Sequence, residues 1–451
     1  MRQHWPAPPA QGILLACEEK PAAMKLNDSN VVSEVKIPQH GLPSDFKSEE
    51  KQNFDLWSLF QLPEFQTGDF SSGRSALSIR TTPSTVSRDA RSGLCNKTHL
   101  VVLVHGLGGD YSDWEVVYEQ AMNCDELDHM LFYVSIANEK TRTRRGIDVC
   151  GDALVEEVQR VCARSRTLTK ISFVGHSLGG LISRYAIGRM FDPGSGTILG
   201  LAPAHFVTMA TPHLGCDGGG ITQVPLLGWA REVPLIGGSV QRAMAQVAAP
   251  VSEMLYGRTG QQLWLQDAAE GSDAGRPLIE RMASWDPEDG HFLRSLAAFS
   301  SRTAYANVSG DHLVGWANSS LRSGSQLPPV DSLRGLVNII EADDPARPAG
   351  DFPAPDDASP TGSRGPAPLL ERRESRVSAM LANLQELPWR RVDVWIKDPF
   401  SHFMAHNHIQ VTSKWINGVG QPIVRHLTSL LGSLERRAGA DDPRAAAAKE
   451  A

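Results

Sequence analysis

A serine at position 177 stands in the run GHSLG (175–179), after an apolar β-branched stretch and before a helix-period pattern. Strand, tight turn and helix are therefore expected in this order, with the serine at the apex. A serine hydroxyl is a poor nucleophile unless it is positioned and deprotonated, and a sharp turn at the positive end of a helix positions it. Gly175 and Gly179 omit Cβ atoms that would clash there. The alternative is an ordinary Gly-rich turn with a capping serine.

A second motif lies upstream, where an apolar run predicted as a buried central strand ends at HGLGG (105–109). The tetrahedral intermediate of acyl transfer needs two fixed hydrogen-bond donors for its oxyanion. The backbone N–H groups of Leu107 and Leu178 are the candidates, because α/β-hydrolases take one donor from each of these two loops. We interpret His105 as a structural residue of the loop, since the base of this fold follows the serine in sequence.

The acid is expected downstream of the serine, at the end of a strand. A short strand at 303–308 runs into Ser-Gly-Asp, which places Asp311 on a tight loop at the carboxyl edge of the sheet. Its role would be to orient an imidazole and to stabilise the imidazolium. The alternative for Asp311 is an Asx-turn, and Asp286 and Asp289 fit the expected place less well.

Three histidines follow the last predicted strand (391–396), at positions 402, 406 and 408. The base must lie on the loop after this strand, and any of the three fits. His406 is the preferred candidate, with His402 and His408 as alternatives. A metal site built from the three is disfavoured, because the spacing has no zinc signature and no carboxylate or cysteine ligands accompany it.

The elements that must position these residues alternate between strand and helix. Strands are predicted near 100–105, 131–136, 170–175 and 205–210, and helices near 113–122, 147–164 and 178–190. Such alternation predicts the α/β class: an α/β-hydrolase fold with a mostly parallel central sheet, helices on both faces, an inserted lid region and disordered termini.

Composition changes along the chain divide it into regions. Polar residues 1–96 are expected to be largely disordered, and 97–435 to form the α/β-hydrolase domain. Within that domain, 216–300 has apolar groups punctuated by Gly and Pro, which suits a lid over an apolar pocket or, alternatively, the core of a subdomain. Pro-rich residues 343–368 and the tail 436–451 are predicted to be disordered.

Overall composition excludes several classes of function. With a net charge of -7 and no dominating basic patch, nucleic acid is not an expected partner. The six cysteines form no C-x-x-C pair, and no apolar run reaches the length of a transmembrane segment. Without a recognisable signal peptide, the expected location is intracellular, cytoplasmic or peripheral to membranes or lipid droplets. The oligomeric state stays open.

Together these motifs resemble the putative serine esterase family of lipase-like α/β-hydrolases, and its plant and algal members most. The segments that carry the resemblance are HLVVLVHGLGG, FVGHSLGG, FVTMATPHLG, YANVSGDHLVGW and AHNHIQV, within residues 97–325 and 388–430. By position, Ser177 matches the family's nucleophile, Asp311 its acid and His406 its base. Related fungal members act on phospholipids and associate with lipid droplets, so the resemblance implies acyl-ester hydrolysis on lipids.

The expected function is that of a serine hydrolase that cleaves carboxylic esters of lipids through an acyl-enzyme, as lipases and phospholipases do. This chemistry needs no metal and no cofactor. One alternative is an acyl thioesterase with the same triad. The other is a non-catalytic binding or scaffold protein on a hydrolase fold, since a fold alone does not prove activity.

Overall fold

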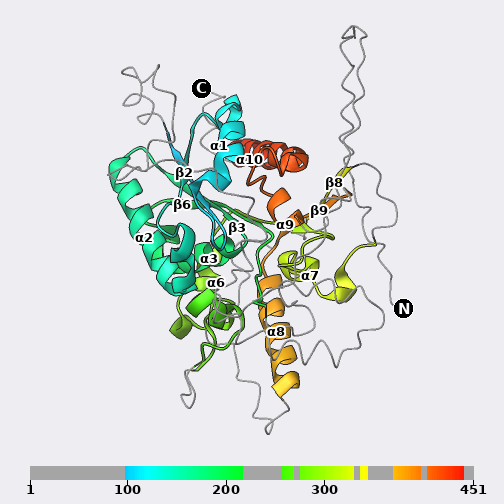
Figure 1. Cartoon of the computed structure of the whole chain (residues 1–451). Coiled ribbons are helices and arrows are strands. Elements are labelled where there is room, and N and C mark those ends of the chain that lie inside the picture. The colour runs from blue at the N-terminus through cyan, green and yellow to red at the C-terminus, as the bar shows by residue number, and fades with distance from the viewer. Residues whose placement is uncertain are drawn as a thin grey trace, which may run out of the picture. The chain divides into compact units, whose positions relative to one another are not determined.

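The structure, a computed structural model, describes residues 97–216, 256–268, 275–329, 336–343, 369–397 and 404–440. A seven-stranded sheet with the order β2-β1-β3-β6-β7-β9-β8 forms the centre of these residues (Figure 1). Its strands are β1 (His99–Val104), β2 (Met130–Val134), β3 (Lys170–His176), β6 (Ala202–Met209), β7 (Ser301–Asn307), β8 (Val337–Asp343) and β9 (Arg390–Ile396).

All neighbouring strands of this sheet are parallel except the edge strand β8, which runs antiparallel to β9. A separate two-stranded hairpin joins β4 (Phe191–Asp192) to β5 (Thr197–Ile198). The prediction of a mostly parallel sheet is confirmed, and β1, β2, β3, β6, β7 and β9 correspond to the six predicted strands. The edge strand β8 was not among the strands predicted from the sequence.

Helices cover both faces of the sheet, as Figure 1 shows. The α-helices are α1 (Glu115–Met122), α2 (Ile147–Arg164), α3 (Leu178–Met190), α5 (Leu278–Arg281), α6 (Phe292–Ala297), α7 (Trp316–Ser319), α8 (Leu369–Gln385), α9 (Ala405–His408) and α10 (Gln421–Ala440). Residues 256–263 are also helical. The 3-10 helices are η2 (Tyr111–Trp114), η3 (Asp125–Leu127), η4 (Lys140–Arg145), η6 (Pro287–Asp289), η7 (Gly324–Gln326) and η9 (Gly418–Gly420).

Two hydrophobic cores lie on opposite faces of the sheet. Side chains alternate along β1, so that Leu100 and Val102 point to one core while Val101 and Leu103 point to the other. Helices α2, α3, α6 and α8 pack on the first face, and α1 and α10 pack on the second. Because both faces are covered, β1 is a continuous apolar run from Leu100 to Val104, as a strand buried on both faces is expected to be.

The predicted lid lies only in part within the described residues, which exclude 217–255 and 269–274. Of the remainder, Thr259 accepts a hydrogen bond of 2.9 Å through its hydroxyl from the backbone N–H of Gly146. Helix α6 packs closely on α3, where Gly188 leaves room for the ring of Phe292. Whether this region moves as a lid stays a prediction.

Three other predicted regions lie at or beyond the limits of the described residues. Residues 1–96 and 344–368 fall outside them. Helix α10 continues to Ala440, five residues past the expected domain limit at 435, because this segment is composed of Arg, Ala and Gly with no proline to stop a helix. None of the helices in the described part of the chain combines the length and apolar character that crossing a bilayer requires.

Candidate active site

Ser177 occupies a strained turn between β3 and α3. Its φ of 52° and ψ of -125° lie outside the ordinary regions for a residue with a side chain. The turn is held by a hydrogen bond of 2.8 Å from the N–H of Ser177 to the carbonyl of Met209. A Cβ at Gly179 would lie 2.1 Å from the carbonyl oxygen of Val104, so only glycine fits there. The half-buried serine hydroxyl therefore projects from a rigid apex at the carboxyl ends of the strands.

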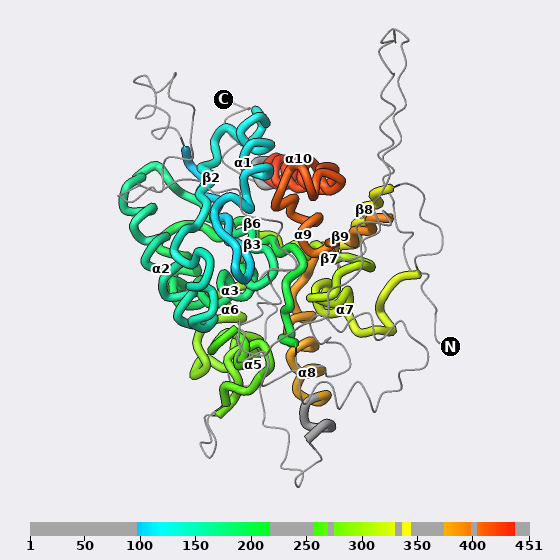
Figure 2. The backbone as a smooth tube through the Cα atoms, in the orientation of Figure 1, coloured from blue at the N-terminus to red at the C-terminus, as the bar shows by residue number. Residues whose placement is uncertain are grey.

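His406 contacts both other candidate residues of the triad. Its Nε2 lies 2.8 Å from the hydroxyl of Ser177, and its Nδ1 lies 2.9 Å from a carboxylate oxygen of Asp311. A carboxylate can only accept, so Nδ1 carries the ring proton and Nε2 presents its lone pair to the serine hydroxyl. His406 lies on α9, and Figure 2 shows α9 and α10, the next α-helix in the chain.

Asp311 follows β7, the neighbour of β9 in the sheet, and is buried. One carboxylate oxygen accepts hydrogen bonds from the N–H groups of Leu313 and Val314, at 3.0 and 2.9 Å. The other accepts from Asn307, at 2.8 Å, as well as from His406. Burial by itself would raise the pKa of Asp311, but its interactions with His406 and these donors hold it below its usual value. The carboxylate therefore stays ionised beside the imidazole.

His176 was not among the residues predicted to matter, although it directly precedes the serine. Its Nε2 donates a hydrogen bond of 2.8 Å to the backbone carbonyl of His406. Burial, together with the nearby His406, lowers the pKa of His176 to about 3. A neutral imidazole thus fixes the backbone of the residue that contacts Ser177.

The loop after β1 lies directly against the serine. A Cβ added to Gly106 would come within 3.0 Å of the Cβ of Ser177. The N–H of Gly108 donates to the hydroxyl of Thr143, at 3.0 Å, which fixes the backbone next to Leu107. Leu178 is the first residue of α3, so its N–H has no acceptor within the helix. The two candidate oxyanion donors thus come from backbone segments that adjoin Ser177.

The alternative bases are placed differently. His408 is buried, and its Nδ1 lies 3.0 Å from the side-chain nitrogen of Asn417. His402 lies outside the described residues. The geometry therefore brings His406, and not His408, to the serine.

The stretch after β6, which ends the segment FVTMATPHLG, supports the serine turn through hydrogen bonds. The hydroxyl of Thr211 donates to the carbonyl of Ser177, at 3.0 Å. The buried guanidinium of Arg184 donates to the carbonyls of His213 and Met282, at 2.9 and 3.0 Å. Burial lowers the pKa of Arg184 to about 9. These bonds join the loop after β6 to α3 and to the end of α5.

A mostly parallel sheet covered on both faces, with a serine at a strained strand-to-helix turn, defines an α/β-hydrolase. The model of the family described as Putative serine esterase (DUF676) matches residues 95–321, just over half of the chain. The chain belongs to this family, and the resemblance drawn from its motifs is confirmed.

Two similar curated proteins are described as putative lipases of yeasts. Putative lipase ROG1 of Saccharomyces cerevisiae is 29% identical over 230 residues, 50% of this chain and 29% of the relative. Putative lipase C4A8.10 of Schizosaccharomyces pombe is 27% identical over 250 residues, 54% of this chain and 28% of the relative. The chain thus covers less than a third of the length of these relatives.

Similar solved structures include a phospholipase and a thioesterase. The phospholipase PlaB of Legionella pneumophila has a TM-score of 0.30 and 16% identity. The match covers 49% of this chain and 44% of the PlaB chain. The RedJ thioesterase of Streptomyces coelicolor has a TM-score of 0.28 and 16% identity. The match covers 57% of this chain and 83% of the RedJ chain.

Proposed function

We propose that this chain hydrolyses carboxylic esters of lipids, with Ser177 as nucleophile, His406 as general base and Asp311 as the acid that orients it. The observation that carries the proposal is the unbroken hydrogen-bonded series from Asp311 through His406 to Ser177, at 2.9 and 2.8 Å. Membership of a serine esterase family supports the reaction class. The names of the two yeast relatives, which describe lipases, support lipids as the substrate class.

The first half of the reaction forms an acyl-enzyme. The hydroxyl oxygen of Ser177 attacks the ester carbonyl carbon while Nε2 of His406 takes the hydroxyl proton. The N–H groups of Leu107 and Leu178 donate to the oxyanion that develops on the carbonyl oxygen. The intermediate then collapses, the C–O bond to the alcohol breaks, and His406 returns its proton to the leaving alcohol.

The second half releases the acid. His406 takes a proton from a water molecule, whose oxygen attacks the acyl carbon, and the same two N–H groups hold the second oxyanion. The bond to the oxygen of Ser177 breaks, and His406 returns the proton to the serine. Because the base must be neutral to accept a proton, the rate is expected to fall at acid pH.

Labelling with a fluorophosphonate probe tests for an activated serine. We expect the wild-type protein to react and Ser177→Ala to remain unlabelled. His406→Ala should also lose labelling, whereas His408→Ala, its control on the same short helix, should retain it. Absence of labelling in folded wild-type protein, with and without lipid vesicles, would overturn the hydrolase proposal and favour a binding module.

Substrate class is tested with matched acyl groups. A thioesterase remains the second candidate because the same residues would cleave a thioester. Oxygen esters of increasing acyl length, phospholipid vesicles and the corresponding coenzyme A thioesters should be compared by kcat/KM. We expect long-chain oxygen esters to be preferred, and a consistent preference for thioesters would replace the lipase proposal with the thioesterase.

A further inference from the structure

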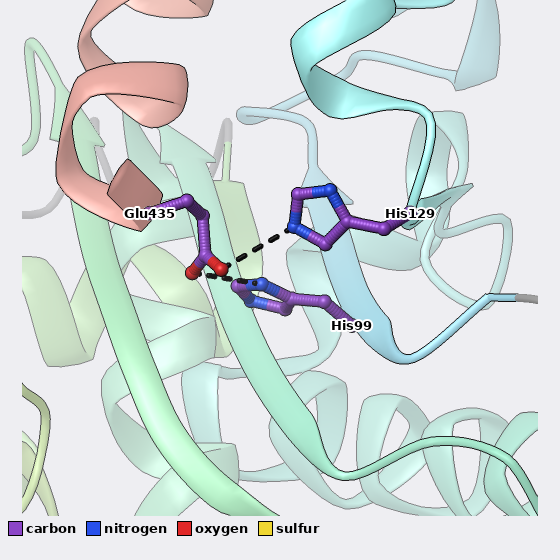
Figure 3. A group of neighbouring side chains, drawn as sticks. All are labelled: His99, His129 and Glu435. Atoms are coloured by element: carbon purple, nitrogen blue, oxygen red, sulfur yellow. Dashed lines mark hydrogen bonds and ion pairs between the residues drawn. The ribbon is translucent and has the colours of Figure 1, made fainter. Parts of the chain in front are cut away.

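A second cluster of titratable side chains lies at the opposite edge of the sheet from Ser177. It is composed of His99 at the start of β1, His129 just before β2, and Glu435 on α10 (Figure 3). Strand β3 begins beside the cluster and ends next to the serine, so its seven residues place the two sites on the order of 20 Å apart. The cluster takes no part in the proposed hydrolysis.

The ligand atoms of His99, His129 and Glu435 all lie within 4.8 Å of one another, close enough to hold one metal ion. Nδ1 of His99 lies 3.2 Å from one oxygen of Glu435, and Nε2 of His129 lies 3.3 Å from the other. Zinc bound about 2.0–2.1 Å from its ligands holds neighbouring donors about 3.3 Å apart. A third imidazole adjoins the same carboxylate, since Nε2 of His205 lies 3.0 Å from it.

Hydrogen bonds to serines orient two of the rings, as the outer partners of metal ligands do. Nε2 of His99 lies 2.7 Å from the hydroxyl of Ser172, and Nδ1 of His205 lies 2.9 Å from that of Ser301. Each ring therefore turns its other nitrogen toward Glu435. The buried Nδ1 of His99 faces the carboxylate of Glu435 at 3.2 Å. A cation between the two groups would bind both.

One cation already contacts the carboxylate of the cluster. The ammonium group of Lys170, 2.9 Å from Glu435, is the cation that a metal would have to displace.

We propose that His99, His129 and Glu435 form a zinc site, with Lys170 as the competing cation. A nitrogen-rich donor set with one carboxylate favours zinc over calcium or magnesium. The site joins the edge of the sheet to α10, the helix that follows α9 and η9 in the chain. Bound zinc is therefore expected to stabilise the docking of this helix.

Calorimetric titration of chelator-treated full-length protein with Zn²⁺ alone tests the site. We expect saturable binding of one ion per chain and a thermal midpoint that rises with zinc concentration. His129→Ala, at a partly exposed position, should weaken binding about tenfold or more. His291→Ala is the matched control, since this histidine lies on another surface, and it should bind as the wild type does.

Two further measurements separate this site from fortuitous binding. Lys170→Met should tighten binding severalfold, whereas Lys97→Met, a lysine at the same edge of the sheet, should not. Cobalt(II) should give the absorption of a four-coordinate nitrogen and oxygen site without a thiolate charge-transfer band, which excludes the cysteines. Circular dichroism checks that each variant is folded. Absence of saturable binding, or equal binding by wild type and His129→Ala, would overturn the proposal.

Discussion

The ring of His176 donates a 2.8 Å hydrogen bond to the backbone carbonyl of His406, and the two rings lie 4.8 Å apart between centroids. The residue that precedes the proposed nucleophile therefore holds the backbone of the proposed base. Because His176 belongs to β3 and His406 to α9, this bond joins two elements separated by 230 residues of sequence. It fixes the position of His406 independently of the bond to Asp311.

Removing the His176 donor should slow catalysis only by displacing His406. His176→Phe keeps a ring of similar size but cannot donate, and a small displacement of His406 should lower the rate of fluorophosphonate labelling about tenfold to a hundredfold. The kcat for an ester should fall more than KM rises. His176→Gln, whose amide can still donate, should restore part of the rate. Equal labelling of His176→Phe and wild type would contradict this positioning role.

Replacing Asp311 by asparagine should lower kcat far more than replacing His176 does. The amide cannot stabilise an imidazolium and favours the wrong tautomer of His406, so kcat should fall about a thousandfold or more. Asp286→Asn is the control, because Asp286 was the weaker candidate in sequence and its side chain is about half exposed. Steady-state hydrolysis of one ester by Asp311→Asn and Asp286→Asn checks the prediction. Equal loss of activity in the two variants would contradict it.

The lack of room for a side chain at position 179 can be tested by replacing Gly179 with alanine. In Gly179→Ala the new Cβ would lie 2.1 Å from the backbone oxygen of Val104, which cannot rotate away. We expect a loss of about 1–3 kcal/mol in the free energy of unfolding together with loss of labelling. Gly324→Ala adds the same atom where nothing lies within 4 Å, and should leave both unchanged. Urea denaturation measures the difference, and similar midpoints for the two variants would refute the predicted clash.

Acid should destabilise the protein through its buried neutral histidines. An unfolded histidine has a pKa of about 6.5, whereas burial lowers that of His176 to about 3. Between these values the unfolded state binds more protons, so the free energy of unfolding falls as pH falls, by up to about 1.4 kcal/mol per pH unit for this group. Urea denaturation at pH 7, 6 and 5 should give a shallower pH dependence for His176→Gln than for wild type. Parallel curves would show that this histidine does not contribute.

What could be predicted from the sequence was encoded locally. The turn at Ser177 and the loop before Leu107 are each specified by a few neighbouring residues, because glycines, an apolar strand and a following helix lie within one short segment. Asp311 could be found for a similar reason, since a strand that ends in Gly-Asp presents its carboxylate at the sheet edge.

Long-range contacts could not be predicted in the same way. His406 and His408 follow the same strand, and two residues on a helix point about 200° apart. Which of them reaches Ser177 depends on the side of α9 that faces β3, which sequence alone does not specify. Likewise, His99 and Glu435 meet only because α10 packs against the sheet edge from which β1 starts.

Strands β7 and β9 are immediate neighbours in the sheet, with Asn307 paired to Val394, although the chain makes β8 and α8 between them. Asn307 donates both to Asp311 and to the carbonyl of Ala405, next to His406. The stretch of chain from 315 to 389 thus begins just after the acid, and the chain re-enters the sheet in β9, beside β7. In evolutionary terms, this stretch can gain or lose sequence while the acid and the base keep their spacing. It is a position where members of one family can diverge in regulation or partners and still share a reaction.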